Sequence, residues 1–122
     1  MLKAIGITAV LLAAGAVPAF AEDTCTVPTI PVSIDGATAT KDQILAGIKA
    51  SKDYIAASDT YQQCIGDYVT AAKADAAKDK KPVDPALIQV ELAKADASQA
   101  NKQKVGDTIN SAIGAYKKAH PG

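Results

Sequence analysis

The hydrophobic positions along this chain change their spacing twice. Residues 4–17 form an apolar run without a charge, and residues 27–34 place valines and isoleucines between prolines. From residue 41 onward, apolar residues recur at spacings of three, four or seven, which is the repeat of one helix face. Prolines at the spacing of residues 28 and 31 favour an extended or polyproline path. The pattern therefore predicts an all-α domain preceded by an extended segment.

The first helix is predicted over residues 41–81. Thr40 and Gln43 have the spacing of a capping box, which starts a helix at Lys41, and Pro82 stops the helix. A break near Ser58 or Gly66 would divide this helix, so a three-helix domain is the alternative. The apolar face comprises Ile44, Leu45, Ile48, Ile55, Ile65, Val69 and Ala72.

The second helix is predicted over residues 85–118. Asp84 is a suitable N-cap, and Pro85 suits the first turn of a helix. The two helices would form a long antiparallel hairpin. The apolar side of the second helix comprises Leu87, Ile88, Leu92, Ala95, Val105, Ile109, Ile113 and Tyr116.

The first 21 residues have the features of a signal peptide. Lys3 supplies a positive start, the apolar run follows, and Ala19-Phe20-Ala21 is a small-x-small cleavage site. The run is too short for a comfortable transmembrane span. Cleavage after Ala21 leaves residues 22–122, enough for a single domain, in the periplasm or outside the cell and without a membrane segment.

Two cysteines, Cys25 and Cys64, remain in the exported chain. They allow one intramolecular disulfide, which is the expected state in an oxidising compartment, whereas a metal or redox pair would require closer spacing or further ligands. Such a bridge stabilises the fold by about 4 kcal/mol on the chain-entropy model. It would fix residues 22–40 as an extended strap over the groove between the helices. The apolar residues expected to cover that groove are Val27, Ile30, Val32 and Ile34.

A row of three tyrosines suggests either a core or a contact surface. Tyr54, Tyr61 and Tyr68 are spaced by seven residues, and a small residue follows each of them after three positions. This is the seam of a coiled coil, so a packed core is the expected interpretation. A contact surface would instead need these rings to be exposed in a cleft. The small residues are Ala57, Cys64 and Ala71.

Charge and residue inventory indicate no catalytic site. Without Lys3 the chain has 12 lysines and 13 acidic residues and no arginine, so neither nucleic acid nor anionic lipid is an expected partner. The single histidine, His120, lies near the C-terminus, and no haem-attachment motif occurs. The pairs Lys49–Asp53 and Glu91–Lys94 are interpreted as solvated helix pairs. No enzyme activity, metal or cofactor is expected.

Two short stretches carry a resemblance. Asp35-Gly36-Ala37-Thr38-Ala39-Thr40 and Ser58-Asp59-Thr60-Tyr61-Gln62-Gln63-Cys64, together with the signal peptide and the cysteine before a proline-containing segment, resemble a group of small exported alphaproteobacterial proteins of unknown function with an SDxYQxC-type motif. The resemblance implies export and paired cysteines. It implies no activity, ligand or catalytic residue.

Three functions are compatible with these features. The first is a non-enzymatic structural or interaction protein that associates with itself or with a protein partner through its helix seams, because two long helices with few large apolar residues are marginal alone. The second is a stress or chaperone-like protein that binds unfolded clients. The third is a carrier of a small apolar ligand held between strap and hairpin.

Overall fold

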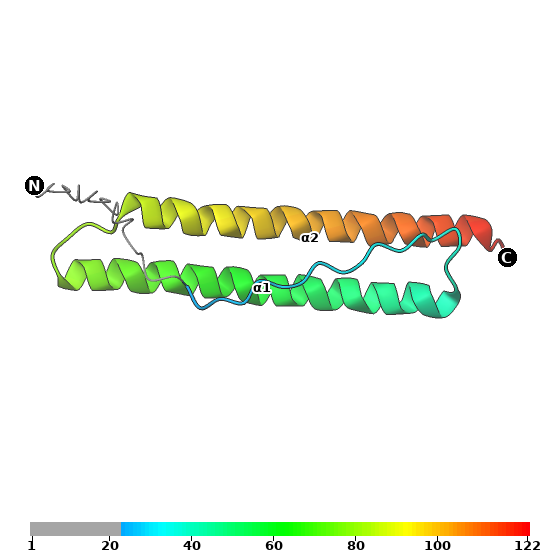
Figure 1. Cartoon of the computed structure of the whole chain (residues 1–122), viewed down its shortest axis with the longest axis horizontal. Coiled ribbons are helices and arrows are strands. Elements are labelled where there is room, and N and C mark those ends of the chain that lie inside the picture. Colours follow the sequence, from blue (N-terminus) through cyan, green and yellow to red (C-terminus); the bar gives the residue numbers. More distant parts are fainter. Residues whose placement is uncertain (1–22) are drawn as a thin grey trace, which may run out of the picture.

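The structure, a computed structural model, describes residues 23–122. The predicted signal peptide, residues 1–21, lies outside the described residues. The described chain forms two α-helices, α1 (Lys41–Lys78) and α2 (Pro85–Ala119), and no strand. The helices lie antiparallel and side by side over most of their length (Figure 1). The predicted all-α helical hairpin is thereby confirmed, and neither helix is long and apolar enough to cross a membrane.

A reciprocal pair of hydrogen bonds fixes the start of α1. The Gln43 backbone N–H donates to Thr40 Oγ1 over 3.2 Å, and the Thr40 N–H donates to Gln43 Oε1 over 2.9 Å. This is a capping box, as the sequence predicted. The helix then continues through Ser58 and Gly66 to Lys78, without a break at either residue.

The end of α1 comes three residues earlier than predicted. The Lys81 N–H donates to the Ala76 carbonyl over 2.9 Å and the Lys80 N–H donates to the Ala77 carbonyl over 3.1 Å, while Lys80 has a φ of 54°. These are the two bonds and the left-handed residue of a Schellman motif. The helix cannot reach residue 81 because Pro82 disfavours helical geometry in the residue before it.

The start of α2 lies at the predicted residue, Pro85. The Asp84 side chain accepts a hydrogen bond from the Ala86 N–H over 2.8 Å, and Pro85 occupies the first position, where a helix needs no N–H. The helix ends at Ala119, one residue beyond the prediction. Beyond it, the His120 N–H donates to the Tyr116 carbonyl over 3.0 Å.

The buried residues of each helix follow a heptad spacing. In α2 a buried residue recurs every seven positions, and in α1 the spacings alternate between three and four, which keeps the buried side chains on one side of each helix. Much of this seam is small or polar, so the core is thin. The buried residues of α1 are Ile44, Gly47, Ser51, Tyr54, Ser58, Tyr61 and Ile65; those of α2 are Glu91, Ser98, Val105 and Ala112.

The row that accompanies the tyrosines differs from the prediction. Ala57 and Ala71 are exposed, and the buried residues next to the tyrosine row lie three positions before each tyrosine, not three after. Leu45 and Leu92, expected on the apolar faces, are each 53% exposed. Apolar character misled the interpretation here, because serines and a glycine occupy several of the buried seam positions. The buried residues before the tyrosines are Ser51, Ser58 and Ile65.

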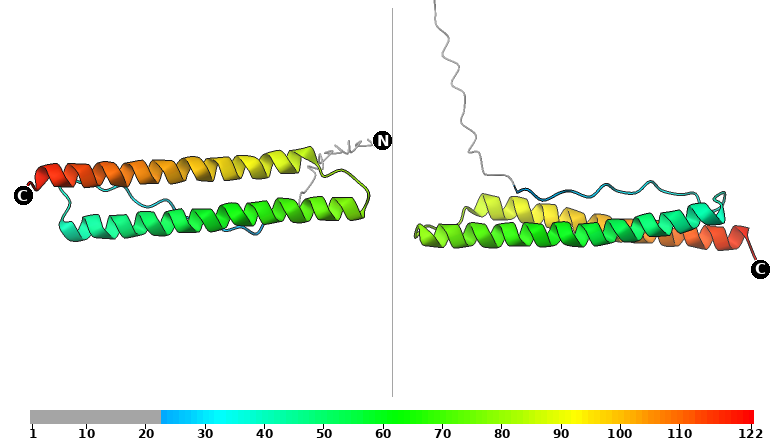
Figure 2. Two further views of the ribbon diagram at one scale, coloured as in Figure 1. Left: turned by 180° about the vertical axis from the view of Figure 1, so that it is seen from behind. Right: turned by 90° about the horizontal axis from the view of Figure 1, so that it is seen from below.

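Residues 23–40, which we call the N-terminal segment, lie along one face of the hairpin (Figure 2). From Cys25 to Ile34 every third residue is partly buried and the residues between are exposed. A repeat of three is that of a polyproline II helix, and this stretch has no backbone–backbone hydrogen bond, as such a helix requires. The residues turned toward the helices are Cys25, Pro28, Pro31 and Ile34.

Three of the four apolar residues expected over the groove point elsewhere. Val27, Ile30 and Val32 are 70%, 53% and 91% exposed. Only Ile34 packs inward, against the cluster formed by Ala39, Ile44 and Ala112. The reason is the repeat of three, which turns the prolines rather than these side chains toward the hairpin.

Two glycines let this segment approach the helices. An ideal Cβ on Gly36 would lie 1.9 Å from the carbonyl oxygen of Ala112 in α2, and one on Gly47 of α1 would lie 2.2 Å from Cδ1 of Ile34. Both distances are far shorter than ordinary contact. The segment therefore touches both helices closely, and a Cβ at either glycine would displace a neighbouring atom.

Candidate functional site

The disulfide joins the N-terminal segment to the middle of α1. Cys25 and Cys64 are bonded, with their Cα atoms 5.7 Å apart and a separation of 39 positions in sequence. Both cysteines are partly buried, and the described chain contains no free cysteine. The predicted disulfide is confirmed.

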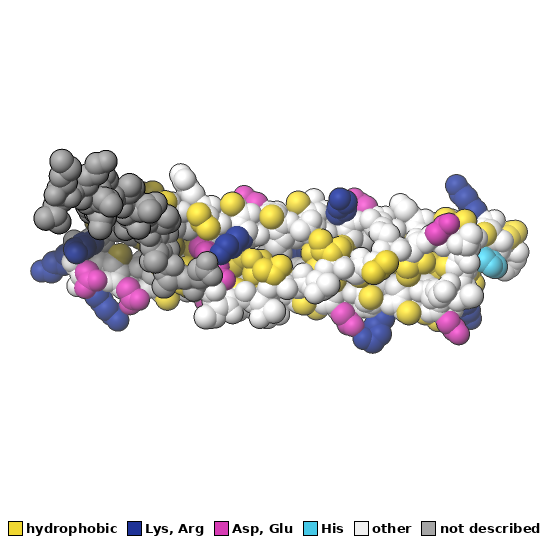
Figure 3. Space-filling model, in the orientation of Figure 1, with side chains coloured by type: hydrophobic (Ala, Val, Ile, Leu, Met, Phe, Trp, Pro, Cys, Tyr) yellow, Lys and Arg dark blue, Asp and Glu magenta, His cyan; other side chains and the backbone are white. Residues whose placement is uncertain are grey.

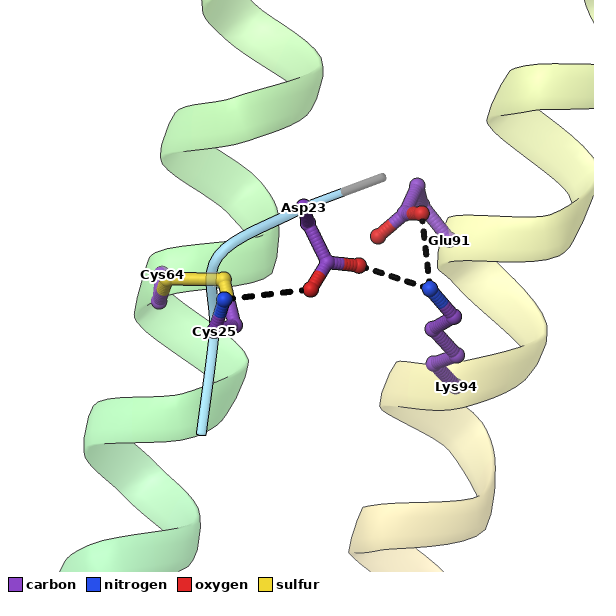
Figure 4. A network of polar contacts seen from close by, with 5 residues as sticks. All are labelled: Asp23, Cys25, Cys64, Glu91 and Lys94. Atoms are coloured by element: carbon purple, nitrogen blue, oxygen red, sulfur yellow. Dashed lines mark hydrogen bonds and ion pairs between the residues drawn. A yellow bond between two sulfur atoms is a disulfide. The ribbon is translucent and has the colours of Figure 1, made fainter. Parts of the chain in front are cut away.

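A cluster of charges beside the disulfide joins the same segment to α2 (Figure 4). One Asp23 oxygen accepts a hydrogen bond from the Cys25 N–H over 3.1 Å, and the other lies 2.7 Å from Nζ of Lys94. Lys94 Nζ also lies 3.1 Å from Oε1 of Glu91. Asp23 therefore links the start of the segment to α2 two residues before the disulfide links it to α1.

The two carboxyl groups of this cluster have pKa values shifted in opposite directions. The hydrogen bond from Lys94 holds the pKa of Asp23 below its usual value. Loss of solvent and the neighbouring Asp23 raise the pKa of Glu91, whose Oε2 is buried without a hydrogen-bond partner among the described residues. The hydrogen bond to Asp23 raises the pKa of Lys94 well above its usual range. One ammonium thus serves two carboxylates, of which Asp23 is the more readily ionised.

This geometry suits attachment rather than chemistry. The side chains of Asp23 and Glu91 are only 6% and 5% exposed, so a substrate has no access to either carboxylate. A buried, hydrogen-bonded ion pair fixes geometry, and removing one partner is costly because it strands the other charge. The cluster therefore holds the N-terminal segment in place between the helices.

The sequence interpretation missed this cluster. Glu91 and Lys94 were expected to form a solvated pair, but the Glu91 residue is 4% exposed and sits in the seam of α2. The spacing of this pair within α2 could not reveal its third member, Asp23, which lies 68 positions before Glu91 in the sequence. The other pair, Lys49–Asp53, is exposed as expected, with 78% and 64% of its side chains accessible.

The tyrosine row belongs largely to the core. Tyr54 and Tyr61 are each 6% exposed, so these two rings offer no contact surface, and Tyr68 is half-buried. Burial and the nearby Asp23 raise the pKa of the Tyr61 hydroxyl. For Tyr54 and Tyr61 the contact-surface alternative is therefore corrected in favour of the core.

The single histidine lies apart from the charge cluster, at the C-terminal end of α2. The ring of His120 stacks on that of Tyr116 with 4.3 Å between centroids, and its Nδ1 lies 3.0 Å from the Tyr116 carbonyl oxygen. Over residues 23–122 no three potential ligands gather into a metal site.

No family model, curated protein or solved structure matches this chain. What can be said of its function therefore comes from its own residues.

Proposed function

We propose that this is an exported, non-enzymatic protein that binds another protein through the outer face of its N-terminal segment. The observation that carries the proposal is the exposure of three large apolar side chains in one short stretch: Val27, Ile30 and Val32 are 70%, 53% and 91% exposed. We call these three residues the apolar ridge. Apolar groups gathered on a surface are typical of protein contact sites.

Figure 3 supports this location. Hydrophobic side chains run along the middle of the face that carries the segment, and most charged side chains lie toward the ends and edges. Residues 24–34 include no charged residue. A partner with an uncharged apolar groove fits this surface better than a charged one.

The attachment of the segment is what makes the ridge a suitable ligand. In this proposal residues 23–40 act as a strap, held at one end by the disulfide and Asp23 and at the other by the close contact of Gly36 with α2. A polyproline II segment fixed in advance loses little conformational entropy on binding, and aromatic-lined grooves recognise such segments. In this proposal the two helices pack as a coiled coil through their heptad seams and form the surface on which the strap lies.

Export is supported by the disulfide and by the signal-like N-terminus. Disulfides persist in oxidising compartments and are rare in the cytosol. The non-enzymatic role rests on the residue inventory: the charge cluster is closed to solvent, and the single histidine is stacked on a tyrosine at the end of α2.

The test compares two triple variants of the full chain, recovered from the periplasm without reductant. The ridge variant carries Val27→Thr, Ile30→Thr and Val32→Thr, which preserve β-branching and remove apolar surface. The control variant removes the same number of exposed apolar side chains from the helices, at Leu45, Val90 and Leu92, which are 51–53% exposed.

Native mass spectrometry then reads the bound partner directly. We expect a complex with the unaltered chain and with the control variant, and a bare monomer with the ridge variant. A complex that survives in the ridge variant, or a monomer in all three samples, contradicts the proposal. If the partner is a second copy of this chain, the same comparison shows whether the ridge forms the dimer.

A chaperone-like role is the second candidate. It is favoured by the spread of exposed apolar residues over both the segment and the helices. This role predicts concentration-dependent suppression of a client protein's aggregation, reduced in both triple variants. Loss of suppression in the ridge variant alone would favour a single defined partner instead.

A further inference from the structure

A cavity of about 250 Å³ lies between the N-terminal segment and the two helices. Residues 30–34 of the segment border it, with the Ile34 side chain packed inward, and α2 contributes an apolar floor of Val105, Ile109 and Ala112. An engineered apolar cavity of about 150 Å³ holds benzene, so this volume suits a molecule of about ten non-hydrogen atoms. It is smaller than the pockets that bind drug-sized ligands.

One wall of the cavity is polar and lacks partners. Asn101, Lys104 and Thr108 line it from α2, at spacings of three and four that place them on one side of the helix. Within residues 23–122, none of these three side chains makes a hydrogen bond or ion pair. An amide, an ammonium and a hydroxyl are therefore all free to donate to a ligand.

The charge at this wall has one sign. No aspartate or glutamate lines the cavity itself. Asp35 and Asp107 line an adjoining hollow near Gly36, which shares Ile34, Thr108 and Ala112 with the cavity. A single ammonium beside two neutral donors complements a carboxylate, which accepts several hydrogen bonds at once. The absence of arginine removes the planar fork that commonly grips phosphate groups.

We propose that this cavity binds a small amphiphilic monocarboxylate. Its apolar part lies between Ile34 and the floor formed by Val105 and Ile109, and its carboxylate lies at Lys104, with Thr108, one turn further along α2, donating to it. The class comprises medium-chain fatty acids and arylalkanoic acids of about ten non-hydrogen atoms. This site is distinct from the apolar ridge, although Ile30 and Val32 border both.

Octanoate is a suitable probe, and octan-1-ol has the same chain without the charge. Calorimetric titration of the oxidised full chain should give a dissociation constant on the order of 0.1 mM for octanoate, the affinity expected of a ligand of this size. A charge-assisted hydrogen bond at a partly exposed site should make octanoate bind about tenfold more tightly than octan-1-ol.

Two lysine variants distinguish the contribution of the Lys104 charge from the effect of removing any positive charge from α2. Lys104→Gln should weaken octanoate binding about tenfold and leave octan-1-ol binding unchanged, because glutamine keeps a side chain of similar length without the charge. Lys117→Gln changes an exposed lysine of the same helix that does not line the cavity, and it should leave both ligands unaffected.

Nuclear magnetic resonance locates the ligand. We expect shift changes at the methyl groups of Ile34, Val105 and Ile109. The proposal fails if octanoate shows no saturable binding in the millimolar range, so that the cavity holds only water. It also fails if octanoate and octan-1-ol bind equally, if Lys104→Gln has no effect, or if the shift changes lie elsewhere. None of these results bears on the ridge, so the two proposals can fail separately.

Discussion

Replacing Gly36 with alanine tests whether the N-terminal segment packs against α2. The added Cβ would lie 1.9 Å from the Ala112 carbonyl oxygen, 2.7 Å from its carbonyl carbon and 2.9 Å from its Cα. Ordinary contact begins near 3.4 Å, so the backbones would have to separate by about 1.5 Å. Overpacking of this kind costs about 1–3 kcal/mol, and here the obstacle is backbone, which cannot rotate away.

The net loss of folding stability in Gly36→Ala is smaller than the cost of the steric clash alone. Alanine restricts the unfolded chain more than glycine does, which returns up to about 1 kcal/mol. The φ of Gly36 lies outside the left-handed region, so alanine can adopt its conformation without strain. We therefore expect Gly36→Ala to lower the free energy of unfolding by about 2 kcal/mol.

Gly47→Ala is the matched control. Its Cβ would lie 2.2 Å from Cδ1 of Ile34, which is the end of a side chain that can change rotamer at a cost of about 1 kcal/mol. Gly47 is inside α1, where alanine gains about 1 kcal/mol of helix propensity. These effects oppose each other, so the variant should unfold within about 1 kcal/mol of the original chain.

Urea unfolding followed by far-ultraviolet circular dichroism, with the disulfide intact, measures both variants. We expect Gly36→Ala to unfold at a clearly lower urea concentration than Gly47→Ala, with similar slopes. If Gly36→Ala unfolds with the original chain, the segment does not pack against Ala112 as described. If both variants lose equal stability, the contrast between backbone and side-chain obstacles is wrong.

Four further perturbations have defined outcomes. Replacing Cys25 and Cys64 with serine should lower the free energy of unfolding by about 4 kcal/mol for a separation of 39 residues, measured by the same urea titration; unchanged unfolding would contradict the anchoring role. Lys80→Gly should raise the melting temperature by relieving about 1 kcal/mol of left-handed strain, and a lower melting temperature would exclude the Schellman geometry. The fold raises the pKa of Glu91 above its usual value of 4.5. The protonated side chain therefore stabilises the folded state below pH 4.5, and this stabilisation is lost as the pH rises through the pKa that Glu91 has in the folded protein. Glu91→Gln should remove that part of the pH dependence of the melting temperature, and parallel curves would refute the assignment. An added Cβ would meet no atom within 4 Å at three helix glycines, Gly66, Gly106 and Gly114. Replacing each of them with alanine should raise the free energy of unfolding by about 1 kcal/mol in the same urea titration, and a lower value would show that the added methyl group meets a neighbour.

The helix boundaries were largely predictable because their signals are local. The capping box at Thr40 and the Asp84-Pro85 start each involve residues within one turn of the helix end, so no tertiary contact was needed to find them. The disulfide followed from counting, since two cysteines have one intramolecular pairing. The early end of α1 was the exception, because Lys80 adopts a conformation that lysine rarely favours.

The charge cluster could not be predicted from spacing. Glu91 and Lys94 have the same separation whether they are exposed or buried, and their partner Asp23 comes from a distant part of the sequence. A glutamate in a heptad seam is unfavourable unless a partner is supplied from outside its helix. The buried serines Ser51 and Ser98 also misled the apolar-face assignment, because these small side chains are buried in the seam although they are polar.

For the N-terminal segment, the extended path was predicted correctly, but the side chains that face the helices were not. The prolines indicated a polyproline path, and that path has a repeat of three, which alone would have turned Cys25, Pro28 and Pro31 toward the helices. Assigning the valines and isoleucine to the groove ignored this repeat and assumed that apolar residues must be inside. Exposed apolar side chains that gather in one patch commonly mark a binding site. Since the fold already buries the face that the repeat dictates, we propose that the exposed ridge serves binding rather than folding.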